Sequence, residues 1–285
     1  MTKRPVTLAV AMAFAASVAL SGCDRTSSLT EQEHIQRAKD YEDKGNLKES
    51  VIELKNAIQK NPDSAQARLL LGEIYLKLGQ GNEAEKEFSR AEKLGVKSET
   101  VKLQLGKALL LMGNYQRVLD EVSPSESASP QNRAVFLRLR GDALLALRKL
   151  NEGCELYKAS LAADPKHMEA YWGLANCAVQ RRDLKSARAM IDAAIQANPA
   201  YPGNWVVLGD FERLNNNPQA AVEAYSTALK QNPAKLAKLD ALFGRAQVFA
   251  SSAKFDQAQS DLETLNKIDA NFYGTHYYQY TSWLV

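Results

Sequence analysis

The feature that most constrains this sequence is a repeat of about 34 residues that runs through most of its length. The related segments begin, in order, at Glu31, Ala65, Glu99, Ala134, Met168, Pro202 and Leu239, with an eighth at Tyr273. The steps between them are 34, 34, 35, 34, 34, 37 and 34 residues. A unit of this length is one supersecondary element, and such units bury a continuous core only when they stack. The spacing therefore predicts a solenoid.

Each repeat carries the signals of two helices joined by a turn. Small residues stand at the eighth and twentieth positions, where paired helices approach closely, and large apolar residues stand at the twenty-fourth, between repeats. The large set is Leu54, Phe88, Tyr157, Ile191, Tyr225 and Leu262. Turn signals such as Gly45-Asn46 follow the first helix, and Asn-Pro or Asp-Pro pairs such as Asn61-Pro62 end the second. Good helix formers dominate the composition, so the predicted class is all-α.

The best-preserved repeats identify the pattern. Arg68-x-x-Leu71-Gly72-x-x-Tyr75 followed by Ala84-x-x-x-Phe88 resembles the tetratricopeptide repeat. The segment from Trp205 through Leu208-Gly209 to Ala221-x-x-x-Tyr225 and Pro233 resembles it too. The resemblance implies a right-handed superhelix of about seven helix-turn-helix repeats over residues 31–272. It also implies a surface that binds other proteins.

Three places depart from the regular repeat. The third repeat, 99–133, has a short second helix from Tyr115 to Val122 that runs into a Ser/Pro stretch ending at Pro130, which predicts a bend. Residues 234–238 are an insertion that we expect to lengthen a helix or a turn. Residues 273–285 resemble the first helix of an incomplete eighth repeat, because no capping helix follows it. We interpret the array as truncated there.

The N-terminus has the pattern of a lipoprotein signal peptide over residues 1–22. Lys3 and Arg4 precede an apolar run of about 15 residues, which is shorter than the roughly 20 that a membrane span needs. The run ends in Leu20-Ser21-Gly22-Cys23, which resembles a lipobox with Cys23 as the lipidated residue. Residues 23–30 would be a tether on a membrane that faces the periplasm. The alternative is an ordinary secreted protein with a chance cysteine.

Asp24 follows the cysteine that we expect to be lipidated. By resemblance to enterobacterial lipoproteins, aspartate at this place favours retention in the inner membrane, and the outer membrane remains the alternative.

Charge and motif content argue against several functions. The formal net charge is +3, and removal of the signal peptide's Lys3 and Arg4 leaves 34 basic residues against 33 acidic ones. A nearly neutral body gives no electrostatic reason to expect nucleic acid. The three histidines, His34, His167 and His276, are far apart, and no hydrolase, zinc-protease or phosphate-loop motif occurs. We expect no enzyme activity, no metal and no cofactor.

The resemblance implies a concave groove lined by positions 2, 5, 9, 12 and 13 of the first helices. The candidate partner-binding residues are Arg138, Asp142, Trp172, Asn176, Gln180, Asp210, Arg213, Phe243 and Gln247. A partly exposed Trp beside Asn and Arg is typical of an interaction hot spot. The alternative for Trp172 is packing on a neighbouring helix. The Lys/Asn pattern that binds the acidic tails of cytosolic chaperones is missing.

Cys154 and Cys177 fall at position 21 of the fourth repeat and position 10 of the fifth, both directed into the same seam between repeats. One interpretation is a disulfide, which an oxidising periplasm permits if the Cα atoms lie within about 7 Å. The other, which we prefer at this point, is that both are small buried residues.

A narrower resemblance rests on the lipobox, on residues 38–47, 54–62 and 67–78, and above all on the irregular segment 113–122. Together they resemble the repeat lipoprotein of the exosortase/PEP-CTERM protein-sorting system, whose members are longer. That resemblance implies a scaffold beside exopolysaccharide export and protein sorting. The alternatives are a pilotin-like or outer-membrane assembly role and direct binding of polysaccharide.

Overall fold

The computed structural model describes residues 29–269, and within that range the chain forms fourteen α-helices and no strand. The helices of the first three repeats are α1 Glu31–Asp43, α2 Leu47–Lys60, α3 Ala65–Lys77, α4 Gly81–Lys93, α5 Ser98–Leu111 and α6 Tyr115–Glu121. The others are α7 Pro130–Ala146, α8 Leu150–Ala163, α9 Met168–Gln180, α10 Leu184–Ala197, α11 Pro202–Leu214, α12 Pro218–Lys230, α13 Lys235–Ser251 and α14 Phe255–Ile268. Seven helix pairs confirm the predicted all-α repeat fold.

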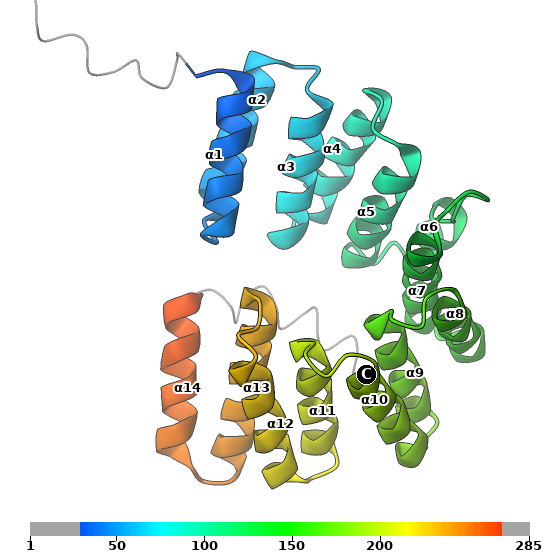
Figure 1. Cartoon of the computed structure of the whole chain (residues 1–285), viewed down its shortest axis with the longest axis vertical. Helices are drawn as coiled ribbons and strands as arrows, with labels where there is room; N and C mark the ends of the chain where they lie inside the picture. Colours follow the sequence, from blue (N-terminus) through cyan, green and yellow to red (C-terminus); the bar gives the residue numbers. More distant parts are fainter. Residues whose placement is uncertain (1–28, 270–285) are drawn as a thin grey trace, which may run out of the picture.

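The helices stack in chain order. Each odd-numbered helix packs on the even-numbered helix after it, and each even-numbered helix from α2 to α12 packs on the next odd one. The first helices of neighbouring repeats also touch directly: α3 contacts α5, α7 contacts α9, and α11 contacts α13. Figure 1 shows the resulting curved path, with α1–α6 in one half, α9–α14 in the other and α7 and α8 at the bend. The first helices therefore share one continuous side of the solenoid.

Every turn within a helix pair contains one residue in the left-handed backbone conformation. Position 15 of each repeat has a positive φ. In chain order these residues are Gly45, Gly79, Gly113, Arg148, Arg182, Asn216 and Ala253, with φ between 56° and 76°. The left-handed conformation turns the chain back so that the second helix packs against the first. Glycine and asparagine marked four of these turns in the sequence, whereas Arg148, Arg182 and Ala253 carry no such signal.

The largest buried side chains fill the seams between repeats, as the repeat pattern predicts. Tyr157, at position 24 of the fourth repeat, is fully buried. A Cβ atom added to Gly141 would lie 2.9 Å from its ring, and one added to Gly173 of the next repeat would lie 2.5 Å from it. Only glycine at both positions lets the two helices close on the tyrosine.

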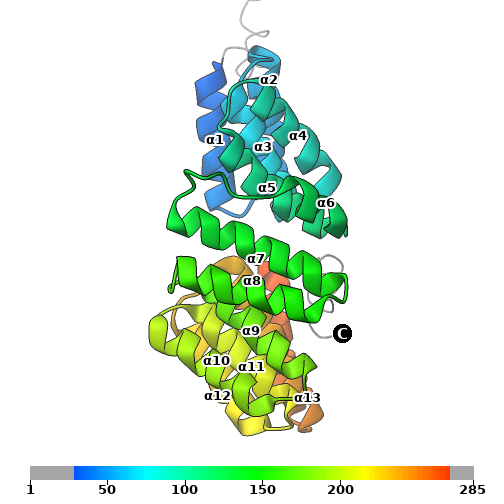
Figure 2. The same cartoon turned by 90° about the vertical axis from the view of Figure 1, so that its right-hand side faces the viewer.

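The two irregular regions both lengthen a first helix. Helix α6 has seven residues, and after a loop the helix α7 begins at Pro130, four residues before the repeat start expected at Ala134. Likewise α13 begins at Lys235, four residues before Leu239. Proline at the first helical position and the Ser129 cap make the early start of α7 favourable. Figure 2 shows α7 and α8 lying across the molecule between α5 and α9.

Several predictions fall outside the described range. The signal peptide 1–22, the lipidation site Cys23 and the incomplete repeat 273–285 all lie beyond residues 29–269. Among the described helices, none combines the length and the apolar character that crossing a membrane requires.

Candidate functional site

The candidate site is the surface shared by the first helices, which has an open hollow between α3 and α5. The hollow has a volume of about 460 Å³ and is lined by Glu73, Leu76, Lys77, Gln104, Lys107 and Leu111. Glu73 and Lys107 both occupy position 9 of their repeats, one repeat apart. The leucines give the hollow an apolar surface beside these two charges.

Burial perturbs both charged groups in this hollow. Burial first, and the negative charge of Glu42 second, raise the pKa of the Glu73 carboxyl above its ordinary value. Surrounding protein first, and the positive charge of Arg138 second, lower the pKa of the Lys107 ammonium, although part of that side chain is exposed. Glu73 accepts a hydrogen bond of 3.1 Å from the Gln104 amide. Within residues 29–269 neither charge lies within 4 Å of an oppositely charged group.

Neighbouring charges on the same surface behave differently. Lys77 forms an ion pair with Glu42 of the preceding repeat. Arg138 lies 2.5 Å from the carboxylate of Asp142 on the same helix. Glu73 and Lys107, which attract each other without forming an ion pair within 4 Å, thus lie between two ion pairs.

Sequence reasoning missed Glu73 and Lys107 because its groove candidates began at the fourth repeat. The signal was available, since the same position 9 holds Lys39, Glu73, Lys107 and Asp142 in the first four repeats. Their charges alternate along the chain of first helices. Read in register from the first repeat, that row would have predicted the site.

Two predicted groove acids are bonded to buried tyrosines. Asp142 accepts a 2.7 Å hydrogen bond from the Tyr157 hydroxyl, and Asp210 accepts one of the same length from Tyr225. Burial is the main cause that raises the pKa of both carboxyls, and these bonds partly oppose it. Arg213 completes the second cluster, 3.4 Å from Asp210. A buried tyrosine hydroxyl requires an acceptor, so both acids have a structural role. The Asp142 side chain is only 10% exposed, whereas 37% of the Asp210 side chain stays exposed on the surface.

Trp172 packs on the next repeat. Its Nε1–H donates to the Oδ1 atom of Asn204 at 3.0 Å, and its ring stacks on Tyr201 with centroids 5.9 Å apart. Asn204 is fully buried and donates to the backbone oxygens of Ala194 and Asn198 at 2.9 and 3.0 Å. Of the two interpretations of Trp172, the geometry agrees with packing. Asn204, which the sequence analysis did not single out, joins α10 to α11.

The remaining groove candidates lie in the second half of the array. Gln180 donates to Asn176 at 3.1 Å, one turn apart on α9. Phe243 is half-buried against the cluster of Leu239, Leu242 and Leu265, and Gln247 is exposed. This part of the surface offers amides where the first half offers charges.

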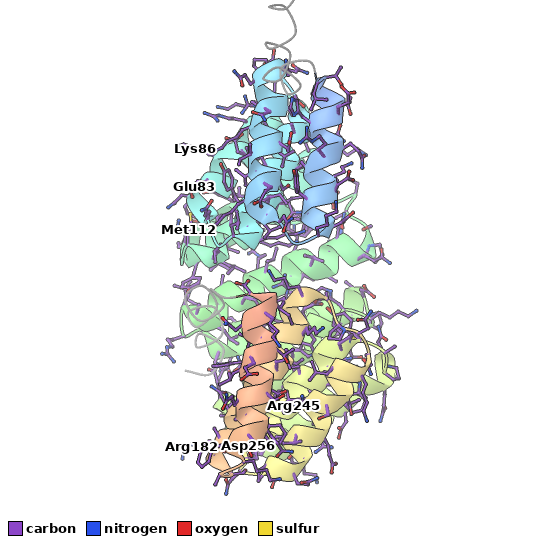
Figure 3. The ribbon with its side chains drawn as sticks, turned by 90° about the vertical axis from the view of Figure 1, so that its left-hand side faces the viewer. Glu83, Lys86, Met112, Arg182, Arg245 and Asp256 are labelled. Carbon is purple, nitrogen blue, oxygen red and sulfur yellow. A yellow bond between two sulfur atoms is a disulfide. The ribbon has the colours of Figure 1, made fainter. Side chains whose placement is uncertain are left out.

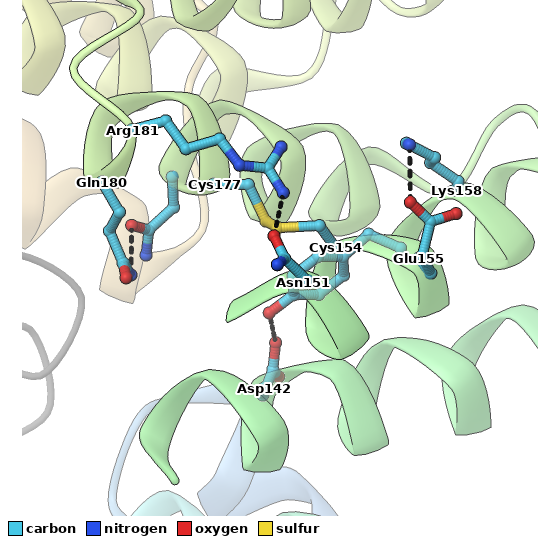
Figure 4. Close-up of a disulfide and its surroundings, with 10 residues drawn as sticks. Asp142, Asn151, Cys154, Glu155, Lys158, Cys177, Gln180 and Arg181 are labelled. Carbon is cyan, nitrogen blue, oxygen red and sulfur yellow. Dashed lines mark hydrogen bonds and ion pairs between the residues drawn. A yellow bond between two sulfur atoms is a disulfide. The ribbon is translucent and has the colours of Figure 1, made fainter. Parts of the chain in front are cut away.

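A disulfide joins Cys154 of α8 to Cys177 of α9, with Cα atoms 6.1 Å apart (Figure 4). Both cysteines are buried. The preferred expectation of two unbonded small residues is thereby corrected, because the seam brings the Cα atoms within bonding range. Beside the bond, Arg181 donates to Asn151 at 2.8 Å, a second link between the same two repeats.

The described histidines have structural partners. His34 is buried with its Nδ1 atom 2.6 Å from Glu53, which also pairs with Arg37 at 2.9 Å. His167 lies 3.7 Å from Glu169, and burial lowers its pKa. Within residues 29–269 no three metal-binding side chains converge.

Sequence comparison identifies the repeat. Models of the tetratricopeptide repeat match residues 43–102, 138–202 and 209–265, together more than half of the chain. Among curated proteins, human protein O-mannosyl-transferase TMTC1 is 25% identical over 171 residues, which cover 59% of this chain. The matched part spans 19% of that protein, less than a fifth of its length.

Several solved structures share this architecture. PilF of Pseudomonas aeruginosa is 18% identical, with a TM-score of 0.50 covering 73% of this chain and 94% of PilF. A tetratricopeptide repeat protein of Parabacteroides merdae is 16% identical, with a TM-score of 0.56 covering 84% and 93%. PilW, a type IV pilus biogenesis factor, is 17% identical, with a TM-score of 0.52 covering 81% and 98%. At these identities the similarity concerns the fold alone.

Proposed function

This chain belongs to the tetratricopeptide repeat family, and from that premise we propose that it is a non-catalytic scaffold whose groove binds other proteins. The observation that carries the proposal is the hollow between α3 and α5. There the partly buried carboxylate of Glu73 and the exposed ammonium group of Lys107 stand beside leucines, and neither has an ion-pair partner within 4 Å among the described residues. Charged groups that lose water without gaining a partner are costly in a monomer. A bound protein would supply the missing contacts.

We further propose that the scaffold is anchored to a membrane by lipid on Cys23 and faces the periplasm. The lipobox pattern supports the anchor. The Cys154–Cys177 disulfide is consistent with an oxidising compartment. Tethering at a surface raises the effective concentration of the groove, so that modest affinity suffices for binding. The inner membrane is the proposed location because Asp24 follows the cysteine.

The proposed setting is exopolysaccharide export and sorting of PEP-CTERM proteins, and it rests on the resemblance of residues 38–47, 54–62, 67–78 and 113–122. The test is capture of partners from membranes with the full-length lipidated chain, a Cys23→Ala variant and a Glu73→Ala/Lys107→Ala variant. The full-length lipidated chain should capture components of export or sorting. The Cys23→Ala variant should capture fewer of these components from the membrane fraction, and the Glu73→Ala/Lys107→Ala variant should capture none of them. Equal recovery by all three would contradict both the anchor and the groove.

A second candidate is assistance in pilus or outer-membrane assembly. The observation that favours it is the shared architecture with PilF and PilW. Deletion of the gene separates the two candidates. Loss of surface pili with normal exopolysaccharide would support assembly, and the reverse would support export and sorting.

A third candidate is direct binding of polysaccharide through groove aromatics. Trp172, its main proposed contact, is bonded to Asn204 and stacked on Tyr201, which leaves less of the ring for a sugar. Glycan affinity of the full chain, with Trp172→Ala as the comparison, decides this case. Absence of any binding would remove it.

A further inference from the structure

The chemistry of the α3–α5 hollow defines the kind of segment that it accepts. Glu73 and Lys107 are equivalent residues of successive repeats, so their side chains are displaced along the solenoid by one repeat. Helices α3 and α5 touch directly, and helices in contact lie about 8–10 Å apart. Leu76 and Leu111 line the same hollow. Two opposite charges and an apolar surface are therefore held in a fixed order.

Neither charge has an ion-pair partner within 4 Å among the described residues, although Glu73 and Lys107 attract each other at longer range. Lys77, which also attracts Glu73, is paired with Glu42. Arg138, which repels Lys107, is paired with Asp142. The bond from Gln104 satisfies part of the Glu73 carboxylate with a neutral donor. The pKa of Glu73 is raised and that of Lys107 is lowered, with burial as the first cause for each. A ligand that brings an opposite charge to each group would reverse both effects.

We propose that this hollow binds a polypeptide segment that carries one basic and one acidic residue on either side of an aliphatic side chain. The basic residue faces Glu73, the acidic residue faces Lys107, and the aliphatic side chain rests on Leu76 and Leu111. The inference rests on the proposed function and specifies its ligand. At about 3.3 Å per extended residue, charges 8–10 Å apart correspond to positions i and i+3. In a helical ligand, at 1.5 Å per residue, they correspond to about six residues.

Other occupants fit this chemistry less well. An anionic polysaccharide or a nucleic acid compensates Lys107 and is repelled by Glu73. A neutral glycan compensates neither charge. The chain's own residues 270–285 contain no Asp, Glu, Lys or Arg, so they offer no complementary charges. A protein segment with both charges is the occupant that satisfies the whole hollow.

The test is selection of peptides from a random 12-residue display library on the full-length lipidated chain in nanodiscs. The variants are Glu73→Lys, which gives the hollow two positive charges, and Lys107→Glu, which gives it two negative ones. The controls are Glu83→Lys and Lys86→Glu, the same changes on two exposed residues of α4 (Figure 3). Circular dichroism and thermal unfolding of each variant confirm that it folds.

The unmodified chain and both controls should enrich peptides with a basic and an acidic residue around an aliphatic one. The Glu73→Lys variant should enrich peptides with two acidic residues, and Lys107→Glu peptides with two basic residues. Because each variant changes the total charge of the site, this result does not depend on which way the peptide runs. Peptides selected on the unmodified chain should bind either variant about tenfold more weakly, the effect of losing about 1.4 kcal/mol.

Three results would overturn the proposal. If all variants enrich the same peptides, the segment binds elsewhere, and groove recognition survives without this site. If no peptide is enriched, groove recognition of peptides fails as well. If heparin, used as a polyanion probe, binds the unmodified chain, loses binding with Lys107→Glu and gains it with Glu73→Lys, the ligand is a polyanion and not a polypeptide.

Discussion

The Tyr157 hydroxyl donates a 2.7 Å hydrogen bond to the Asp142 carboxylate, and position 24 of a repeat is thereby bonded to position 9 of the same repeat. The sixth repeat forms the same bond between Tyr225 and Asp210. In the second repeat, position 24 is Phe88, which has no hydroxyl, and the acid at position 9 is Glu73. A tyrosine at position 24 therefore gives the acid at position 9 a hydrogen bond to the core, and Glu73 lacks that bond.

Stability should depend on pH through the buried Asp142. Its pKa is raised in the folded chain, mainly by burial, so the folded state binds more protons than the unfolded one above pH of about 4. The free energy of unfolding should therefore fall as pH rises from about 4 to the folded pKa. The difference in the free energy of unfolding between the wild type and Asp142→Asn isolates the contribution of this carboxyl. This difference should fall by at most about 1.4 kcal/mol per pH unit. Denaturant unfolding at several pH values measures it.

Asp183 provides the control of opposite sign. Its hydrogen bonds to Ser186 lower its pKa, so its contribution is present above pH of about 4 and is lost as pH falls through the folded pKa. The difference in the free energy of unfolding between the wild type and Asp183→Asn should consequently not fall as pH rises. Asp210→Asn should show the same direction with a smaller effect, because the pKa of Asp210 is also raised but 37% of its side chain is exposed to solvent. A difference in unfolding free energy that stays constant with pH for both Asp142 and Asp210 would contradict the assignment.

Gly173→Ala should destabilise the protein despite the better helix propensity of alanine. The added Cβ would lie 2.5 Å from the Tyr157 ring, and this overpacking costs about 1–3 kcal/mol against a propensity gain of about 1 kcal/mol. In a Tyr157→Ala background the space is open, so the same glycine change should become neutral or stabilising. Urea denaturation of the four proteins in the cycle checks this. Equal effects of Gly173→Ala in both backgrounds would show that the ring is not the cause.

Much of the fold can be predicted from the sequence, because every repeat places small and large residues at the same packing positions. The small residue Gly141 and the large residue Tyr157 are local signals of one seam, and the 34-residue period extends such signals along the chain. The second close contact of Tyr157, with Gly173, becomes apparent only in the structure. The early start of α7 was not predicted, and for α13 the choice between a longer helix and a longer turn was left open, because the register of the core positions continues regardless of where a helix begins.

The site was less predictable than the fold. Position within the repeat places a side chain on the groove side, but it does not reveal that Asp142 is held by Tyr157 or that Trp172 is held by Asn204. Those bonds join positions in different helices, and their partners become apparent only when the stack is built. The charge row containing Glu73 and Lys107 was readable, since it needs the register alone.

Arg182→Gly should stabilise the protein. Arg182 has a φ of 60°, and the left-handed conformation costs a non-glycine residue about 1–2 kcal/mol, which exceeds the entropic cost of glycine, about 0.5–1 kcal/mol. The expected gain is therefore up to about 1 kcal/mol, measured by chemical denaturation. Arg182→Ala keeps the Cβ atom and should show no comparable gain. If both variants are stabilised equally, loss of the charged side chain, and not relief of the backbone, is responsible.

The last prediction concerns the Cys154–Cys177 disulfide, which closes a loop with a sequence separation of 23 between the fourth and fifth repeats. A cross-link of this length lowers the entropy of the unfolded chain, and its loss should cost about 3 kcal/mol. Cys154→Ala/Cys177→Ala, with Cys23 unchanged, should therefore unfold at lower denaturant concentration. Because both cysteines are buried, a mild reductant should leave the native protein unaffected and act once it unfolds. When reductant is present during unfolding, the denaturation midpoint of the wild type should accordingly move close to that of the double variant, and the midpoint of the double variant should not change. Equal stability of the two proteins without reductant would contradict a stabilising bond, and sensitivity of the variant to reductant would assign the effect to a cysteine other than this pair.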